Sequence, residues 1–195
     1  TICNDYISSG KTGRHETFAP RFGWIKKGFE KAKADPRVFH AKNDIEQLGV
    51  GKNMVRSIKF WCTAFRVLEP SDNTENGRKG ETVPTEFGRF LLDDETGADP
   101  FMEDDATLWL LHWMLFRPPY MAVTWPLAFS FVNMSAFDGK TFAGAVQTAA
   151  NGFDGLKKIS PNSFAKDASC ITRMYRADRE NETEIRCPFE QLDLI

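Results

Sequence analysis

The sequence predicts a mainly α-helical fold: a winged helix-turn-helix-like N-terminal lobe with a small β-hairpin wing, central buried helices and a possible second helix-turn-helix lobe. Three observations support this. A glycine turn at 49–51 separates a short helical pattern from a longer amphipathic one. A loop rich in Asp, Asn, Gly and Lys lies between two short strand-like segments. Two strongly apolar stretches, 108–116 and 123–134, indicate buried helices, since each is too short to cross a bilayer.

Length and charge favour a folded protein with local affinity for polyanions. The 195 residues suffice for one compact domain or two small ones that share a core. A formal net charge of −2 excludes a generally basic nucleic-acid coat, so any such contact needs a local patch. We expect a flexible arm over 1–13, a winged-helix-like lobe over 14–92 and a helical lobe over 93–195. The first residue is Thr and the last ones are apolar, which suggests a fragment of a longer protein.

The N-terminal lobe is predicted to contain three helices. Residues 21–33 place apolar side chains on one side and lysines off it, and Asp35-Pro36 ends this pattern. A short helix over 41–48 follows. After the glycine turn, a helix is expected to run to about Arg66 with an apolar stripe at helical spacing. The stripe consists of Met54, Ile58, Trp61, Cys62, Phe65 and Leu68.

The segment after this helix is predicted to form the wing. Residues 67–69 and 81–83 are short strand patterns, and the polar loop between them would carry Arg78 and Lys79 at its tip. Residues 85–92 resemble the Thr-x-x-Gly-x-x-Leu-Leu segment that closes many winged-helix domains. Together these features predict a β-hairpin that packs beside the long amphipathic helix.

The second lobe is predicted to be helical throughout. An acidic stretch over 93–105 marks its boundary and ends in carboxylates that suit the N-cap of a helix over 106–116. A second apolar helix spans about 122–133, and a third covers 142–150. Residues 160–175 begin with Ser-Pro, an N-cap followed by proline at the first helical position. The last two helices form the weaker helix-turn-helix candidate.

The basic side of the helix after the glycine turn is the strongest candidate for a nucleic-acid contact. A helix that buries one stripe and presents a cationic one suits a polyanion, so nucleic acid is the expected partner. Lys52, Arg56 and Lys59 would neutralise phosphates, and Asn53 would donate to a phosphate or a base edge. A solvated helix face is the alternative. Further candidates from the wing tip and the last helix are Arg78, Lys79, Lys166 and Arg173.

Several motifs resemble, in order, those of one prokaryotic family. They are Gly13-Arg14-His15-Glu16-Thr17-Phe18, Arg21-x-Gly23-Trp24, the Leu48–Arg56 stretch, the Ala106–Trp113 stretch and Cys187-Pro188. Over residues 13–195 the chain is similar to the SspB-like family, a domain of unknown function found in single-strand DNA phosphorothioation defence cassettes. The resemblance implies a cytoplasmic, Mg²⁺-dependent DNA nicking endonuclease of a bacterial anti-phage system. It also implies as partners DNA and the cysteine desulfurase, ATPase and sulfurtransferase subunits of that system.

Nicking requires water to attack a phosphate, commonly with divalent cations held by carboxylates and with a base nearby. His15 and Glu16 are the catalytic candidates, because an imidazole beside a carboxylate can act as a base or a metal ligand. Ion pairs that tie this segment to the fold are an equal alternative. The sequence shows no nuclease signature that we recognise. The metal-ligand candidates are Glu16, Asp93, Asp94, Glu103, Asp104 and Asp105, although helix capping also explains the last group.

Three functions therefore stay open. The first is a DNA nickase or its DNA-binding half. The second is a non-catalytic winged-helix DNA-binding or targeting subunit. The third is a scaffold for sulfur-transfer enzymes, which an exposed aromatic patch together with a buried basic stripe would support. On the apolar helix before the double proline, His112 and the pair Trp109 and Trp113 are expected in the core.

Overall fold

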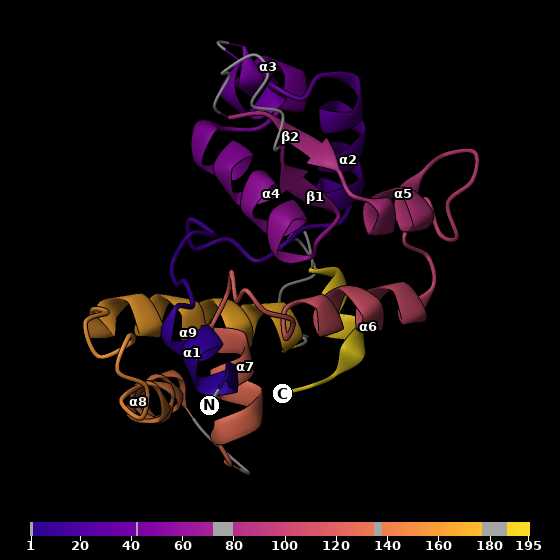
Figure 1. Ribbon diagram of the computed structural model, residues 1–195. Helices are drawn as coiled ribbons and strands as arrows, with labels where there is room; N and C mark the ends of the chain where they lie inside the picture. The colour runs from indigo at the N-terminus through magenta and orange to yellow at the C-terminus, as the bar shows by residue number, and fades with distance from the viewer. Residues whose placement is uncertain (1, 42, 72–79, 135–137, 177–186) are drawn as a thin grey trace.

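The structure, a computed structural model, describes residues 2–41, 43–71, 80–134, 138–176 and 187–195. Within these ranges the chain is mainly helical with one small antiparallel sheet, as predicted, and Figure 1 shows two lobes, one above the other. The upper lobe contains α2 (Trp24–Ala34), the 3₁₀ turn η1 (Val38–His40), α3 (Asp44–Leu48), α4 (Lys52–Ala64), β1 (Leu68–Pro70), β2 (Thr82–Pro84) and α5 (Glu86–Leu92). The lower lobe contains α1 (Ile2–Ser8), α6 (Asp105–Met114), α7 (Thr124–Phe131), α8 (Gly139–Ala150), α9 (Pro161–Tyr175) and the 3₁₀ turn η3 (Pro188–Leu192).

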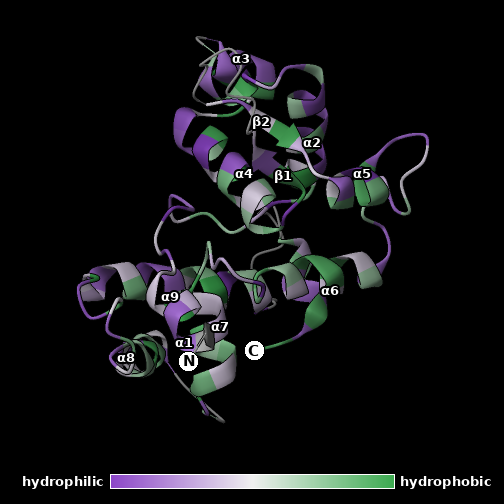
Figure 2. Cartoon of the chain, in the orientation of Figure 1, coloured by the Kyte–Doolittle hydropathy of each residue, from purple (hydrophilic) through white to green (hydrophobic). Residues whose placement is uncertain are grey.

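The packing of α2 against α4 forms the centre of the upper lobe. Gly28 of α2 lies so close to α4 that a Cβ there would be 2.5 Å from Cys62 Sγ and 2.9 Å from Ile58 Cγ2. Polar and apolar residues alternate along α4, which Figure 2 shows as purple and green bands. This alternation places the apolar stripe inward and leaves the start of α4 open to solvent on its other side.

A two-stranded hairpin and a capped short helix complete the upper lobe. β1 and β2 pair antiparallel, with Leu68 opposite Pro84. Thr85 is the N-cap of α5: its Oγ1 accepts the backbone N–H of Gly88 at 2.8 Å and donates to the carbonyl of Arg66 at 2.6 Å. The hydroxyl thus joins the end of the hairpin to the segment that follows α4.

Side-chain caps set the starts of three lower-lobe helices. The Asp104 carboxylate accepts a backbone N–H at the start of α6 at 2.8 Å, which confirms the predicted capping role of this acidic stretch. Asp138 does the same for α8 in a capping box. Ser160 precedes Pro161 at the start of α9, as predicted. α8 packs against α9, and α7 packs against both.

The prediction of two central buried helices holds for α7 but only for one side of α6. Thr124 to Ala128 of α7 are buried. On α6 three large side chains face solvent, and the expected core position of both tryptophans is wrong. Their exposed fractions are 49% for Trp109, 42% for Leu110 and 66% for Trp113. An all-round apolar helix carries no signal for which side packs. Among the described residues, no helix combines the length and apolar character needed to cross a membrane.

Residues 1–13 were expected to form a flexible arm, but the described part, 2–13, contains α1 and packs on the lower lobe. Ile7 is buried, and the backbone N–H of Lys11 donates to the carbonyl of Tyr120 at 3.0 Å. Gly10 lies against Val123, at the start of α7, where a Cβ would have no room. The segment up to residue 13 is therefore packed on the lower lobe, and the chain continues from there to the upper lobe.

Contacts from several segments join the two lobes. Phe189 of η3 stacks on Phe65 with ring centroids 5.0 Å apart and meets Tyr175 of α9 edge-on at 6.2 Å. Arg66, at a left-handed φ of 61°, donates from its guanidinium to the carbonyls of Arg117 and Pro119. The core is consequently continuous between the lobes.

Candidate nucleic-acid interface

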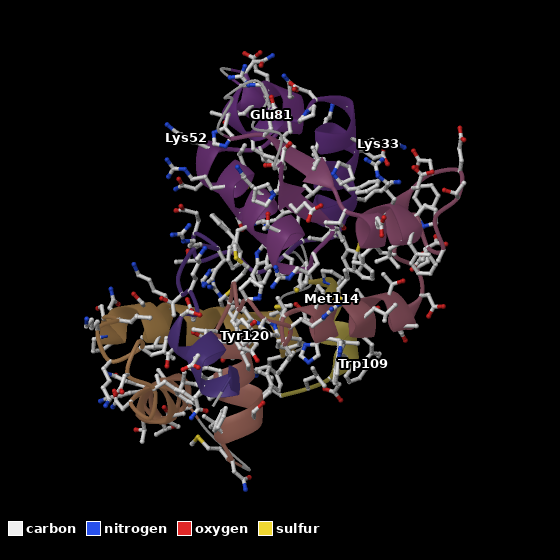
Figure 3. All side chains as sticks on the ribbon, viewed as in Figure 1. Lys33, Lys52, Glu81, Trp109, Met114 and Tyr120 are labelled. Atoms are coloured by element: carbon white, nitrogen blue, oxygen red, sulfur yellow. The ribbon has the colours of Figure 1, made fainter. Side chains whose placement is uncertain are left out.

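The exposed start of α4 carries the predicted basic face. Gly49, at φ 64°, ends α3 in the left-handed conformation that glycine adopts without strain, and α4 begins at Lys52. Lys52, Asn53 and Arg56 are all exposed there, while Val55 and Ile58 on the other side are buried. In Figure 3, Lys52 projects into solvent at the left edge of the upper lobe. Three of the four predicted α4 contacts are therefore exposed to solvent.

Lys59, the fourth predicted contact, is used within the upper lobe. Its Nζ lies 2.8 Å from Nε2 of His40 and 6.0 Å from the centre of the Phe39 ring. Burial lowers the pKa of Lys59, and burial together with the nearby Lys59 charge lowers the pKa of His40. Both shifts suit a lysine ammonium that donates to a neutral imidazole, so the Lys59 side chain is engaged within the upper lobe.

A tight turn at 16–17 brings the two lobes' basic helices together. Glu16 and Thr17 both adopt positive φ, 50° and 66°. A Glu16 carboxylate oxygen lies 3.6 Å from Nη1 of Arg56 on α4. From the other side, Arg173 of α9 donates to the carbonyl of Thr17 at 2.6 Å. Arg56 and Arg173, which lie 117 positions apart in sequence by their numbers, thus flank one turn.

Lys166 extends this basic surface along α9. It lies seven residues before Arg173, two helical turns on the same side, and both side chains are exposed. Ser169 between them is exposed as well, and Ala168 on the opposite side is buried. The two predicted lower-lobe contacts therefore share one open face of α9. Arg78 and Lys79, the predicted wing tip, lie outside the described residues.

A buried polar cluster around Asp167 anchors the segment just before the turn at 16–17. His15 is 1% exposed, and its Nε2 lies 2.8 Å from Oδ1 of Asp167 on α9. The same carboxylate accepts the backbone N–H of Gly13 at 3.0 Å and the Thr124 hydroxyl at 2.6 Å. The indole ring of Trp61, from α4, stacks on the imidazole with centroids 6.0 Å apart. His15 thus connects the turn, α4, α7 and α9, and in this arrangement it is closed to substrate.

This geometry favours the structural alternative for the His15-Glu16 pair. The two side chains point to different environments: His15 to a buried carboxylate, and Glu16 to a half-exposed arginine. The sequence reasoning missed Asp167 and Thr124. Asp167 did carry a signal, because it falls on the inward side of its helix between Phe164 and Ile171, where an unpaired carboxylate is rarely tolerated.

Three of the acidic candidates for metal binding, Asp93, Asp94 and Asp104, already have other partners. Lys33 lies 2.7 Å from Asp93, and this hydrogen bond holds the pKa of the Asp93 carboxyl well below its usual range. Lys26 lies 2.6 Å from Asp94. Asp104 caps α6, and Glu103 and Asp105 are exposed beside it. In the part of the chain that the structure describes, no three His, Cys, Asp or Glu side chains gather as metal ligands.

Comparison with known proteins places this arrangement in a family. The family model "Protein of unknown function (DUF4007)" matches residues 13–195. An SspB crystal structure matches with 36% sequence identity and a TM-score of 0.85, covering 96% of this chain and 58% of that one. A magnesium ion-bound SspB crystal structure matches with 35% identity and a TM-score of 0.84, covering 95% and 57%.

The chain thus spans less than two thirds of the length of both SspB structures. No curated protein matches it. A family model that covers nearly the whole chain, together with a shared fold at this level of identity, confirms the resemblance that the sequence motifs predict. This chain belongs to the DUF4007 family, and it has the fold of SspB-like proteins.

Proposed function

We propose that this chain is the DNA-binding part of an SspB-like protein that acts in a DNA phosphorothioation system and takes part in nicking DNA. The observation that carries the proposal is the solvent-exposed group of Lys52, Asn53 and Arg56 at the start of α4. Two cations one turn apart neutralise neighbouring phosphates, and an amide beside them can donate to phosphate or base. Similarity to SspB supports the system in which this binding takes place.

The order of elements in the upper lobe supports a winged helix-turn-helix reading. A short helix, α3, is followed by the Gly49 turn, by the amphipathic α4 and then by the β1–β2 hairpin. In such domains the second helix enters the major groove with its N-terminal residues toward the bases. Lys52 and Asn53 occupy that position on α4, so we assign α4 as the recognition helix.

DNA is proposed to run across both lobes rather than along α4 alone. Arg56 and Arg173 flank the same turn, and Lys166 lies farther along α9. A phosphate at Arg56 would replace the Glu16 carboxylate, which now lies 3.6 Å away in a half-exposed ion pair. Such pairs contribute little to stability, so the exchange is inexpensive.

The described acids do not fit a magnesium site, and no hydrolytic step is assigned to them. Asp93 and Asp94 are bound to lysines, Glu16 faces Arg56, and Asp104 caps a helix. The magnesium ion-bound SspB structure supports Mg²⁺ as a cofactor of the SspB-like protein as a whole.

A non-catalytic DNA-binding or targeting subunit is the second candidate, favoured by the absence of a metal-ligand group among the described residues. We propose the sulfur-transfer and ATPase subunits as further partners of the whole protein.

Salt-dependent DNA binding tests the first part of the proposal. Fluorescence anisotropy with a labelled duplex, measured over a series of salt concentrations, should give a slope of log K against log salt of about −0.9 for each phosphate contacted. Changing Lys52 and Arg56 to Ala should weaken binding. It should also reduce the magnitude of that slope by about 1.8, which corresponds to two phosphate contacts.

Lys31→Ala with Lys33→Ala is the matched control, since it removes the same charge from the far end of α2. Figure 3 shows Lys33 on the opposite side of the upper lobe from Lys52. Equal effects of the two double variants would mean that general charge, rather than the α4 face, drives the binding. An unchanged affinity in the Lys52 and Arg56 variant would refute the assignment of α4.

A plasmid assay tests nicking. Supercoiled DNA incubated with the protein and Mg²⁺, and separately with EDTA, should convert to open circle only with the metal if this chain belongs to a nickase and carries the active centre. Salt-sensitive binding without conversion would support the non-catalytic candidate for these 195 residues.

A further inference from the structure

One face of α6 carries three large apolar side chains that are exposed to solvent. Trp109 and Trp113, one helical turn apart, are 49% and 66% exposed, and Leu110 beside them is 42% exposed. A fully buried tryptophan removes about 150–250 Å² from water, so leaving two on one helix face forgoes a large stabilisation. Patches of this kind on folded proteins mark interaction sites.

The Trp109 end of this face packs on buried residues. Trp109 meets the buried His112 ring edge-on at 6.0 Å, and His112 Nδ1 lies 2.6 Å from the Tyr175 hydroxyl of α9. On the inner side of α6, Leu108 and Leu111 are buried in the core. A partner that covers Trp109 therefore meets a ring that already contacts the core, which favours affinity.

The N-terminal end of the same face is acidic. Asp105 lies one turn before Trp109 and two turns before Trp113, so the three residues run along one side of the helix over about 12 Å. A shallow, open depression lies here, lined by Ala98, Asp99, Glu103, Asp104 and Asp105. Asp99 and Asp104 are hydrogen-bonded to backbone N–H groups, whereas Glu103 and Asp105 are exposed. The charge of the face is thus negative at one end and neutral along the indoles.

We propose that the α6 face, defined as Glu103, Asp105, Trp109, Leu110 and Trp113, docks a basic amphipathic segment of another protein. Its lysines or arginines would lie over Glu103 and Asp105, and its apolar side would cover the two indoles. Charge complementarity selects this occupant: an anionic DNA backbone or an acidic peptide would be repelled by the same carboxylates. The inference stands apart from the DNA-binding proposal, since Lys52 and Trp109 lie on opposite sides of the molecule in Figure 3.

The test uses a defined probe: a fluorescein-labelled 18-residue helical peptide of leucine and lysine, with leucines at i, i+3, i+4 and i+7. Binding is followed by anisotropy. Trp113→Ala and Trp109→Ala should each weaken it about tenfold, as expected for central aromatic contacts. Glu103→Gln with Asp105→Asn should weaken it several-fold and reduce its salt dependence. Phe22→Ala, which removes another half-exposed ring in the upper lobe, should change nothing.

Several results would overturn the inference. They are no binding by the unchanged chain, equal binding of a leucine–glutamate peptide, equal binding of a scrambled leucine–lysine peptide, or an equal loss in Phe22→Ala. A concentration-dependent dimer that Trp113→Ala abolishes would assign the face to a second copy. Single-stranded DNA binding that is lost in Trp109→Ala and Trp113→Ala would make the indoles a base-stacking platform. Because none of these readouts depends on Lys52 or Arg56, failure here leaves the DNA-binding proposal intact.

Discussion

At the scale of single residues, the buried carboxylate of Asp167 organises the turn between the two basic helices. It accepts from the Gly13 backbone and the Thr124 hydroxyl and pairs with the His15 ring. The second ring nitrogen of His15, Nδ1, has no hydrogen-bond partner among the described residues. The carboxylate is therefore the principal partner that keeps three buried or half-buried polar groups satisfied.

Replacing Asp167 with Ala should destabilise the protein by several kcal/mol, on the order of 3, because each abandoned donor stays buried. Urea denaturation followed by circular dichroism measures this change. Asp154→Asn serves as the control, since Asp154 pairs with Lys157 at the surface with 93% of its side chain exposed, and we expect no measurable change there. A similar stability for both variants would contradict the organising role of Asp167.

His112 should make stability depend on pH. Burial lowers its pKa to about 4, and burial raises the pKa of Tyr175 well above the usual range, so a protonated hydroxyl and a neutral imidazole share the hydrogen bond. The unfolded state binds a proton below about pH 6.5, while the folded state does so only near pH 4. The stabilisation is thus fully present above pH 6.5 and is lost as the pH falls toward 4, by about 3 kcal/mol.

Urea titrations at pH 7, 6, 5 and 4 measure this dependence. His112→Gln should show a flatter profile than the unchanged chain over that interval, whatever its stability at pH 7. His40→Gln, at an exposed site, should keep most of the original slope. Parallel profiles for the unchanged chain and His112→Gln would show that another group carries the pH dependence.

How far the site follows from the sequence differs from residue to residue. The exposure of Lys52 and Arg56 follows from their spacing, because an amphipathic period determines which side of a helix faces water, and their contact with DNA stays a prediction. Lys59 belongs to the same period, yet it lies against His40, which comes from another segment. The spacing of residues along a helix predicts the side of the helix on which a side chain lies. It does not predict which residues from other segments pack against that side chain.

At the scale of elements, two glycines within helices have opposite roles. Gly28 of α2 allows close packing on Cys62 and Ile58 of α4, whereas Gly144 of α8 has nothing within 4 Å of the position a Cβ would take. Both lie in helices, so in each case alanine would gain the same intrinsic helix propensity. The difference between the two substitutions therefore reports the packing of α2 on α4.

Gly144→Ala should stabilise the protein by about 0.5–1 kcal/mol. Gly28→Ala should destabilise it by about 1–3 kcal/mol, because the added methyl group forces the two helices apart. Thermal unfolding of the pair, compared with the unchanged chain, measures both. Stabilisation by Gly28→Ala would mean that α2 shifts readily and that the close approach to α4 is not required.

The helices themselves were predicted well where a cap or a breaker marks their ends. Ser160 before Pro161 and the acids before α6 are local signals that act within a few residues. The exposed side of α6 could not be predicted in this way, since leucine and tryptophan surround the helix and no polar stripe marks the outer side. That choice depends on where α9 and η3 lie, which is information from far along the chain.

At the scale of the whole molecule, η3 acts as a bridge between the lobes. Phe189 is fully buried, stacks on Phe65 above and contacts Tyr175 below. Pro188 and Leu192 of the same short turn are buried too. The bridge is formed by η3, which follows α9 in sequence, so part of the upper lobe's core packs against residues that lie far from it in sequence.

Phe189→Ala should lower the free energy of unfolding by about 3–5 kcal/mol and weaken the cooperation between the lobes. Near-ultraviolet and far-ultraviolet circular dichroism, followed together during urea unfolding, should give coincident transitions for the unchanged chain and separated ones for the variant. Phe22→Ala, at a half-exposed ring, should keep the coincident transitions. Coincident transitions with a large loss of stability in Phe189→Ala would indicate that other contacts suffice to couple the lobes.

The position of His15 affects how genetic experiments on this family should be read. A strain that carries His15→Ala and loses the activity of the protein would look like one with an inactivated catalytic centre. The imidazole, however, is enclosed between Asp167 and Trp61. It fixes the position of the segment around residue 15, which lies in space between α4 and α9. An inactive His15 allele therefore identifies a chemical participant only when the same allele yields protein of normal abundance and normal DNA affinity.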